Sequence, residues 1–240
     1  LVRVLAYEHP DLHTGVVDLD ARDGEADPVA ALITELGLAS TDDVVAWRGD
    51  RRYAERLRRA ALAPTGAPTV RSDGAYVLTG GLGGIGLVVA RWLIEHGAAR
   101  IVLNSRSQPS EEQRAIIAEL EQKAQIAVVS GDLAAPGVAE SLVAAAEQTG
   151  LTLRGVIHGA AVIDDQIVVG IDNETLGRVW APKATAALRL HTATAGKELD
   201  WWVGFSSTSS LLGAPGQAAY AAASAWLDGL VAWRRAAGLP

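Results

Sequence analysis

Short apolar runs alternate with longer segments of helical periodicity along the last two thirds of this chain. The apolar runs predict strands at residues 75–79, 100–104, 126–130, 155–158 and 201–205. The segments between them predict one helix that ends near residue 96 and others that span 111–122, 138–149, 173–194 and 217–237. Short apolar strands separated by helices form parallel sheets that helices cover on both faces. The predicted fold class is therefore α/β, a Rossmann-type doubly wound parallel sheet.

The first 63 residues follow this pattern less regularly. Strands are predicted at 1–6, 16–19 and 44–47, a helix at 28–36, and an exposed helix or extended connector at 51–63. Two prolines and a glycine within 64–68 break any helix and predict a linker. We therefore expect an incomplete α/β unit over 1–63, a linker over 64–72 and a second domain over 73–240.

Both ends of the chain suggest excision from a longer protein. The chain begins with Leu1 and contains no methionine. A larger sheet needs a further strand after the last predicted helix, so the second domain is expected to be truncated at its C-terminus.

The tryptophans give predictions about packing. Trp201 and Trp202 are adjacent on one predicted strand, so they are expected to pack on opposite faces of the sheet. Trp226 and Trp233 lie seven residues apart, a spacing that predicts core positions on one helix face.

Composition excludes several classes of protein. The 240 residues include no cysteine, which excludes a disulfide framework or a thiolate zinc site, so a reducing, cytoplasmic location is expected. The formal net charge of -7 argues against a nucleic-acid partner. No apolar run approaches the ~20 residues that cross a membrane. No second histidine or carboxylate stands at metal-ligand spacing from His158, so we expect no metal, and His158 is interpreted as a packing or backbone-bonding residue.

A glycine-rich run carries the strongest chemical signal. Between a predicted strand and a predicted helix lie Thr79, Gly80, Gly81, Leu82, Gly83, Gly84, Ile85 and Gly86. The run contains both GxGxxG and TGxxxGxG, the second being the spacing of short-chain dehydrogenases/reductases. Glycines permit a turn with positive φ and let the backbone approach a pyrophosphate at the start of the following helix. We interpret the run as a dinucleotide-binding loop; the alternative is a purely structural glycine turn.

The end of the second predicted strand indicates which dinucleotide binds. An NAD site usually places a carboxylate there, but this chain has Asn104, Ser105 and Arg106. A guanidinium beside a hydroxyl suits a 2'-phosphate, which favours NADPH, and the alternative is that Arg106 is a solvated loop charge. Asp132 and Leu133 follow the third strand and are expected near the adenine, although Asp132 equally suits a helix cap.

Three residues of the last third suit carbonyl reduction. Ser207 follows the last predicted strand, and Tyr220 starts the next helix. Reduction of a ketone needs an acid that protonates the developing alkoxide, and a tyrosine serves better when an ammonium stabilises its phenolate. Lys183 is the candidate ammonium. Each residue alone is usually structural, and their joint occurrence behind a nucleotide loop favours catalysis.

Several runs together resemble a known family. They are Thr79 to Gly86, Ser105-Arg106, 156–158, 181–183, 205–207, 213–217, 220–223 and 234–240. The second domain resembles the ketoreductase domain of a type I modular or iterative polyketide synthase, within the short-chain dehydrogenase/reductase superfamily. Residues 1–63 resemble the end of that family's non-catalytic structural subdomain, a truncated Rossmann unit.

The resemblance implies a role for each candidate residue. Tyr220 would protonate the ketone oxygen, Ser207 would hold that oxygen, and Lys183 would contact the nicotinamide ribose and lower the tyrosine pKa. The cofactor NADPH (NADP+) would lie against Thr79, Gly81, Leu82, Gly83, Gly84, Ile85, Gly86, Asn104, Ser105, Arg106, Asp132, Leu133, Ala160, Ala161, Lys183 and Tyr220. Ser224 occupies the position, four residues after the tyrosine, where the family has asparagine. A serine still hydrogen-bonds a water or the lysine, but with one hydroxyl in place of an amide.

The resemblance also implies a product configuration. Ile163, Asp164 and Asp165 resemble the Leu-Asp-Asp marker of B-type domains, and Pro215 matches a second B-type position. Leu212 stands where A-type domains carry tryptophan. These markers predict the D-configured 3-hydroxyacyl product. Ala219 departs from the B-type pattern, and the alternative for Asp164 and Asp165 is a solvated turn.

The function expected from the sequence is NADPH-dependent reduction of a β-ketoacyl chain. The resemblance implies that the chain is tethered to an acyl carrier protein by a phosphopantetheine arm and that other domains of the synthase are partners. One alternative is a catalytically silent scaffold domain, which Ser224 in place of the family's asparagine would indicate. The other is a free-standing short-chain carbonyl reductase.

Overall fold

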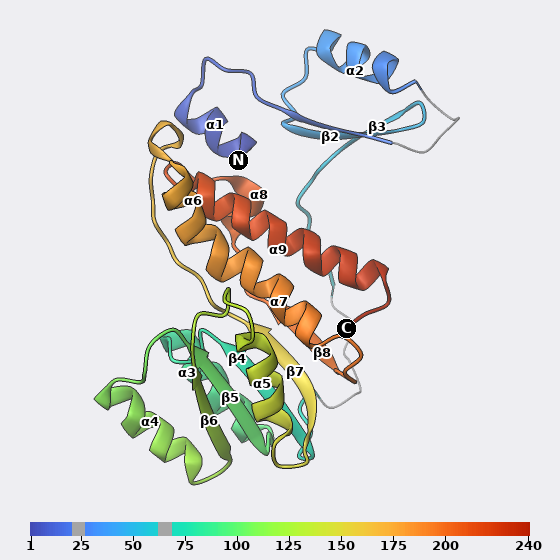
Figure 1. The fold of residues 1–240 in the computed structure, drawn as a ribbon. Coiled ribbons are helices and arrows are strands. Elements are labelled where there is room, and N and C mark those ends of the chain that lie inside the picture. Colours follow the sequence, from blue (N-terminus) through green and yellow to red (C-terminus); the bar gives the residue numbers. More distant parts are fainter. Residues whose placement is uncertain (21–26, 62–68) are drawn as a thin grey trace.

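The computed structural model describes residues 1–20, 27–61 and 69–240 of the chain, which form two separate β-sheets and the helices around them (Figure 1). The strands are β1 (Val16–Leu19), β2 (Val44–Arg48), β3 (Arg51–Ala54), β4 (Gly74–Thr79), β5 (Arg100–Ser105), β6 (Gln125–Ser130), β7 (Thr152–His158) and β8 (Trp201–Gly204). The α-helices are α1 (Val2–Glu8), α2 (Pro28–Gly37), α3 (Gly84–Glu95), α4 (Glu111–Glu121), α5 (Val138–Glu147), α6 (Asn173–Trp180), α7 (Ala186–Ala193), α8 (Thr208–Leu212) and α9 (Ala218–Ala236). A 3-10 helix, η1 (Val168–Gly170), and a π-helix, η2 (Ala181–Thr185), complete the elements. Most of the predicted linker, together with the end of the predicted connector, lies outside the described residues.

The larger sheet has five parallel strands in the order β6-β5-β4-β7-β8. Strand β4 lies at its centre, and the chain winds to one side through β5 and β6 and to the other through β7 and β8. This arrangement confirms the predicted α/β fold with a doubly wound parallel sheet. The predicted strand ends differ most at β7, which begins at Thr152 instead of residue 155.

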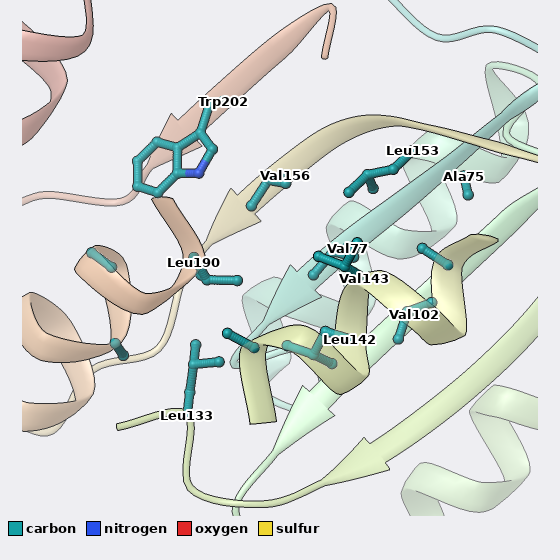
Figure 2. Close-up of a cluster of buried hydrophobic side chains, with 14 of the residues drawn as sticks. Ala75, Val77, Val102, Leu133, Leu142, Val143, Leu153, Val156, Leu190 and Trp202 are labelled. Atoms are coloured by element: carbon teal, nitrogen blue, oxygen red, sulfur yellow. The ribbon is translucent and has the colours of Figure 1, made fainter. Parts of the chain in front are cut away.

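Two apolar layers cover the faces of this sheet. In β4, Ala75 and Val77 belong to one layer and Tyr76 and Leu78 to the other, because successive side chains of a strand alternate. The first layer contains residues of α5, α7 and α9, and Figure 2 shows part of it packed on the strands. The second layer contains residues of α3 and α4. The interior positions of β4 are buried on both sides, as a central parallel strand requires.

The tryptophans follow the predictions except at one position. Trp202 lies in the first layer, whereas Trp201 packs on the second and stacks on Tyr76, with ring centroids 5.4 Å apart. Trp226 is partly buried against the first layer, but the prediction for Trp233 is wrong because its side chain is 54% exposed.

A neighbouring arginine explains this error. Arg234 is only 4% exposed, and its guanidinium lies over the ring of Trp202 at 5.0 Å. Two of its nitrogens also donate to the carbonyl of Pro240. Arg234 therefore takes the inward position at this turn of α9, and Trp233 points outward against His191.

The smaller sheet has the order β1-β2-β3, with β1 parallel and β3 antiparallel to β2. The expectation of a helix or extended connector from residue 51 is wrong for 51–54, which form β3. Gly49 has φ +62 and turns the chain between β2 and β3. Arg52 of β3 then pairs with Glu35 at 2.7 Å and with Asp42 at 2.7 Å, which ties the hairpin to α2 and the preceding loop.

The predicted first strand is also wrong, because residues 2–8 form helix α1. Val2 and Val4 are β-branched and favour a strand in isolation. In the fold, however, Val4 is fully buried against Ala218 and Ala221 at the start of α9, and this packing overrides the local preference.

The helix predicted at 173–194 is present as α6, η2 and α7 in continuous succession. Pro182 lies in η2 and has no N–H to donate, which interrupts the α-helical hydrogen-bond ladder. The interruption falls at Lys183, whose side chain is 1% exposed. The short helix α8 was not predicted.

His158 links the sheet to η2 at this point. It is fully buried at the end of β7, with Nδ1 2.7 Å from the hydroxyl of Thr79 and Nε2 2.9 Å from the carbonyl oxygen of Lys183. A carbonyl oxygen only accepts, so Nε2 carries the proton and Nδ1 accepts from Thr79. The interpretation of His158 as a packing and backbone-bonding residue is confirmed. Burial lowers the pKa of His158 from 6.5 to about 4.

Removing a buried leucine tests the core. Leu142 of α5 is fully buried, so Leu142→Ala is expected to lower the free energy of unfolding by about 2–5 kcal/mol in urea titrations. Leu188→Ala on α7, where the side chain is 47% exposed, is the matched control and should cost less than about 1 kcal/mol. Equal losses in the two variants would contradict the placement of α5.

The buried histidine predicts a dependence of stability on acid. Below pH 6.5 the unfolded chain binds a proton at residue 158, whereas the native imidazole stays neutral until about pH 4. The free energy of unfolding should therefore fall as the pH is lowered from 6.5 to about 4, by at most about 3 kcal/mol. Chemical denaturation of the His158→Gln variant at several pH values should show a flatter dependence than the wild-type chain. The exposed-site control His13→Gln should keep the wild-type dependence, and a His158→Gln profile parallel to wild type would refute this account.

Candidate active site

The candidate site lies where the strand order reverses. The sheet winds in opposite directions from β4, so the carboxyl ends of β4 and β7 border a crevice of the kind in which open α/β sheets bind ligands. Thr79 at the end of β4 pairs with His158 at the end of β7, and both side chains are buried. The glycine-rich loop follows β4 directly at this point.

A side chain is excluded at three positions of the loop, Gly80, Gly81 and Gly86. Gly80 has φ +66, and a Cβ added there would lie 2.8 Å from the carbonyl oxygen of Gly159 after β7. A Cβ on Gly81 would lie 2.8 Å from the carbonyl oxygen of Leu78. A Cβ on Gly86 would lie 2.5 Å from the carbonyl oxygen of Gly80. The start of α3 is therefore drawn tightly onto the end of β4.

The outer side of the loop is open. A Cβ on Gly84 would meet no atom within 4 Å, and Gly83, the N-cap of α3, makes no side-chain cap hydrogen bond. Ile85 is 68% exposed, whereas Leu82 is 3% exposed and belongs to the second apolar layer. The first amides of α3 thus face a space that an anion can approach.

Two adjoining hollows border this loop. The larger, of about 250 Å³, is lined by Gly80, Gly83, Asn104, Ser105, Arg106, Asp132, Leu133, Gly159, Ala160, Ala161, Val162 and Pro182. The smaller, of about 200 Å³, is lined by Leu78, Thr79, Gly80, Gly83, Gly84, Ile85, Gly86, Val89, Ile157, Gly159 and Phe205. Most of the predicted cofactor-binding residues line one of these two hollows. The exceptions, which line neither hollow, are Gly81, Leu82, Lys183 and Tyr220.

The polar residues of the larger hollow have distinct local roles. The amide of Asn104 donates to the carbonyls of Val129 and Gly131, at 3.0 and 3.2 Å, which fixes the ends of β5 and β6 relative to each other. Asp132 accepts from the backbone N–H of Ala134 at 2.9 Å, so it caps a turn and not the helix α5, whose N-cap is Gly137. Arg106 is exposed, and no ion pair joins it to another residue in the described ranges.

Lys183 and Tyr220 meet at the same edge of the sheet. Nζ of Lys183 donates to the Tyr220 hydroxyl at 3.1 Å and lies 4.2 Å from the centre of its ring. The lysine comes from η2 and the tyrosine from the first turns of α9. The contact places a hydrogen-bond donor directly on the hydroxyl oxygen of Tyr220.

Ser207 lies between β8 and α8 and serves as the N-cap of α8. Its hydroxyl oxygen accepts from the Ser209 N–H at 3.2 Å and from the Ser209 hydroxyl at 2.8 Å. Both contacts use the oxygen as an acceptor, so the proton of Ser207 remains available for donation. The role of Ser209 as a donor to Ser207 was not predicted, because helix α8, which begins here, was not predicted.

Ser224 is buried one turn after Tyr220. Its side chain is 0% exposed, and its hydroxyl has no hydrogen-bond partner among the residues described. The hydroxyl of Ser206 donates to the backbone carbonyl of Ser224, at 3.4 Å, and not to the Ser224 hydroxyl. A buried hydroxyl without a protein partner is a typical site for an ordered water.

The predicted stereocontrol residues lie on two segments of the chain. One follows β7, and the other runs from the end of α8 to the start of α9. Asp164 pairs with Arg178 of α6 at 2.8 Å, and Asp165 accepts from the side chain of Gln217 at 3.3 Å. Ile163 is 63% exposed and Leu212 is 53% exposed, and Pro215 is also exposed.

The sequence did not indicate how these elements are held together. The hydrogen bonds from Thr79 to His158 and from His158 to the backbone of Lys183 connect the glycine loop to the lysine through the protein interior. Positions 79, 158 and 183 are distant in sequence. The pairing of β4 with β7 brings Thr79 beside His158, and the hydrogen bond of His158 to the Lys183 carbonyl adds η2.

The residues fit a nicotinamide dinucleotide. The open space at Gly84 and the uncapped start of α3 suit a pyrophosphate, and the exposed Arg106 borders the hollow next to Ser105. The donors are backbone amides, hydroxyls and a guanidinium, which match a phosphate-bearing ligand.

Comparison with known proteins identifies the family. The KR domain family matches residues 74–240. The chain is 60% identical to part of a phenolphthiocerol/phthiocerol polyketide synthase of Mycobacterium tuberculosis (strain CDC 1551 / Oshkosh) over 245 residues, which covers 100% of this chain and 13% of that protein. The chain thus spans about an eighth of the length of this relative.

Solved structures agree in fold and in sequence. An A-type ketoreductase of a modular polyketide synthase superposes with a TM-score of 0.88 at 38% identity, over 99% of this chain and 50% of that one. A C2-type ketoreductase of a modular polyketide synthase gives 0.80 at 33% identity, over 95% of this chain and 49% of that one. The chain therefore belongs to the KR domain family, the ketoreductase domains of polyketide synthases.

Proposed function

We propose that this ketoreductase domain uses NADPH to reduce the β-keto group of a polyketide or fatty acyl thioester carried by an acyl carrier protein. The product is the β-hydroxy thioester. The observation that carries the proposal is the contact of 3.1 Å between a buried ammonium and the Tyr220 hydroxyl, at the sheet edge that also bears the glycine loop. A lysine or tyrosine with a purely structural role has no need for a buried ammonium bonded to a phenol hydroxyl.

The chemistry divides between the cofactor and the chain. Bound NADPH supplies the hydride that forms the new C–H bond at the β-carbon. As the C=O π bond breaks, Tyr220 gives its hydroxyl proton to the ketone oxygen, and Lys183 stabilises the phenolate that remains. Ser207 donates its free hydroxyl proton as a hydrogen bond to the same oxygen.

Ser224 completes the proposed site. Its buried hydroxyl lies one helical turn after Tyr220 and has no partner among the described residues. We expect it to hold a water that takes part in returning a proton to the Lys183 and Tyr220 pair. This role uses a hydroxyl where the family has an amide, and it needs no movement of α9.

NADPH is preferred in this proposal because of Arg106. The guanidinium is exposed beside the larger hollow, and no carboxylate takes its place at the end of β5. A 2'-phosphate offers it charge-assisted hydrogen bonds, whereas the 2'-hydroxyl of NADH does not.

The proposed product has the D configuration of B-type domains. The support is the sequence marker Ile163, Asp164 and Asp165 together with Pro215. The similar solved structures are described as A-type and C2-type, so likeness of fold alone does not distinguish product configuration.

The proposed context is a cytoplasmic synthase with several domains. Residues 1–63 would be the end of a structural subdomain, and 73–240 the catalytic subdomain. The natural partners would be an acyl carrier protein and the neighbouring domains of the synthase, as the length of the curated relative suggests.

Removing the proposed acid tests the function. Tyr220→Phe should lower turnover of a β-ketoacyl N-acetylcysteamine thioester by about 10²–10⁴-fold, because the proton donor is lost. The Kd for NADPH, measured by fluorescence, should stay nearly unchanged. The control Tyr53→Phe, at a side chain that is 49% exposed, should keep full activity. Normal turnover by Tyr220→Phe would refute the assigned acid, and a wild-type chain that binds NADPH without turnover would favour a silent scaffold.

Removing the guanidinium tests the choice of cofactor. Arg106→Gln should raise the KM for NADPH by about 10- to 100-fold, the effect of one or two charge-assisted hydrogen bonds, and should leave the KM for NADH nearly unchanged. Arg114→Gln, at an exposed arginine of α4 that bonds the Pro109 carbonyl, is the control. An equal change for both cofactors would contradict contact with the 2'-phosphate.

A further inference from the structure

Helix α1 contacts the catalytic part of the chain at the start of α9. Val4 is fully buried against Ala218 and Ala221, which flank Tyr220 on either side in the sequence. Gly213, in the loop before α9, has φ +71, and a Cβ there would lie 2.8 Å from Cβ of Arg3. The guanidinium of Arg3 also donates to the carbonyl of Leu211. The first residues of the chain therefore pack directly beside the proposed active site.

The carboxylate of Glu8, at the end of α1, bonds two separate segments at once. Its Oε2 accepts from the backbone N–H of Val168 at 2.6 Å, and its Oε1 accepts from the backbone N–H of Gly216 at 2.7 Å. These segments lie 160 and 208 residues away from Glu8 along the chain. One side chain thus bonds both segments to α1.

The two segments are also paired with each other next to Glu8. The backbone N–H of Gln166 donates to the carbonyl of Gly216 at 2.8 Å, and Gln166 and Gln217 form an isolated parallel bridge. The side chain of Gln217 reaches Asp165. Glu8 therefore closes one end of a short seam between residues 165–168 and 216–217.

This seam joins the two segments that carry the proposed stereocontrol residues. Asp164 and Asp165 precede it on one segment, and Leu212 and Pro215 precede it on the other, which leads into Tyr220. Neither segment has a large apolar core of its own. Ile167 is 57% exposed and Val169 is 72% exposed, and Val168 between them is only partly buried against the small cluster of Val4, Ala218 and Ala221. Polar contacts therefore add to a small apolar contact in holding this part of the structure.

The electrostatics suit a fixed carboxylate. The N–H of Val168, helped by that of Gly216, lowers the pKa of Glu8, so the side chain is ionised at neutral pH and accepts both bonds. A glutamine has the same shape but only one acceptor oxygen, and its NH2 group would face a second N–H donor.

We propose that Glu8 is a positioning residue that holds together the two segments bearing the proposed stereocontrol residues, and that through them it controls which face of the ketone receives the hydride. The proposal rests on the proposed function. Glu8 does not touch the reacting atoms; it acts through the backbone of Val168 and Gly216.

The first test measures the product. With NADPH and the 3-oxobutanoyl thioester of N-acetylcysteamine, Glu8→Gln should lower the ratio of major to minor 3-hydroxy isomer by about tenfold, the effect of one charge-assisted hydrogen bond. The KM for the thioester should rise while the Kd for NADPH stays constant. The control is Glu55→Gln, which removes another carboxylate bonded to α1, through Arg3 at 2.7 Å, but contacts neither segment.

The second test does not need turnover. Hydrogen exchange should be about tenfold faster in peptides that cover 163–170 and 213–217 of Glu8→Gln, and unchanged in peptides of β4 and α3. Val168→Pro offers a separate variant that removes one of the two N–H donors. Its site is the first position of η1, and Ile167 before it has φ -61 and ψ 150, which a following proline tolerates. It should reproduce both effects.

The outcomes separate the two proposals. If the wild-type chain reduces no thioester, the proposed function fails, and unchanged exchange in Glu8→Gln is then what overturns the positioning role. If the wild-type chain is stereoselective, an unchanged isomer ratio in Glu8→Gln and Val168→Pro overturns the role of Glu8, even when exchange becomes faster. A change of equal size in Glu55→Gln also overturns it.

Discussion

The contact between the buried Lys183 ammonium and the Tyr220 hydroxyl is the interaction on which the rest of the site depends. Lys183 is 1% exposed, and no carboxylate in the described part of the chain pairs with it. Burial of an unpaired ammonium is costly, so the surrounding structure must hold it in place. The π-helix η2 sets the lysine backbone, α9 supplies the phenol and its ring, and His158 ties the Lys183 carbonyl to the end of β7.

The sheet explains why these groups converge. Parallel strands bring their carboxyl ends to one edge, and the reversal of order at β4 leaves a crevice between β4 and β7. The glycine loop fills one side of this crevice, while the hydrogen bonds of Thr79 and His158 connect it to Lys183. Helix α1 contacts the start of α9 through Val4 and the backbone of Val168 and Gly216 through Glu8. The glycine loop, the Lys183–Tyr220 pair and the segments bonded by Glu8 are therefore connected by one set of contacts, although their residues come from both ends of the chain.

Much of this fold was predictable from the sequence, because apolar runs and glycine spacing are local signals. The five strands of the large sheet and the glycine loop followed from them, whereas Lys183 and Tyr220 were identified from the chemistry of carbonyl reduction and from the resemblance to polyketide synthase ketoreductases. Helix α1 was not, since Val2 and Val4 favour a strand until Val4 packs on α9. The inward turn of Arg234 in place of Trp233, and the bonds of His158 and Glu8, depend on contacts between segments far apart in sequence. Periodicity carries no information about such contacts.

A structure of the chain with NADP+ bound is the most direct test of the central claim. The account predicts the nicotinamide ring beside the Tyr220 hydroxyl, with room for a ketone carbon about 3–3.5 Å from the hydride-bearing carbon and the Lys183 to Tyr220 contact intact. A bound cofactor whose nicotinamide points away from Tyr220, or a site in which Lys183 and Tyr220 have separated, would contradict it.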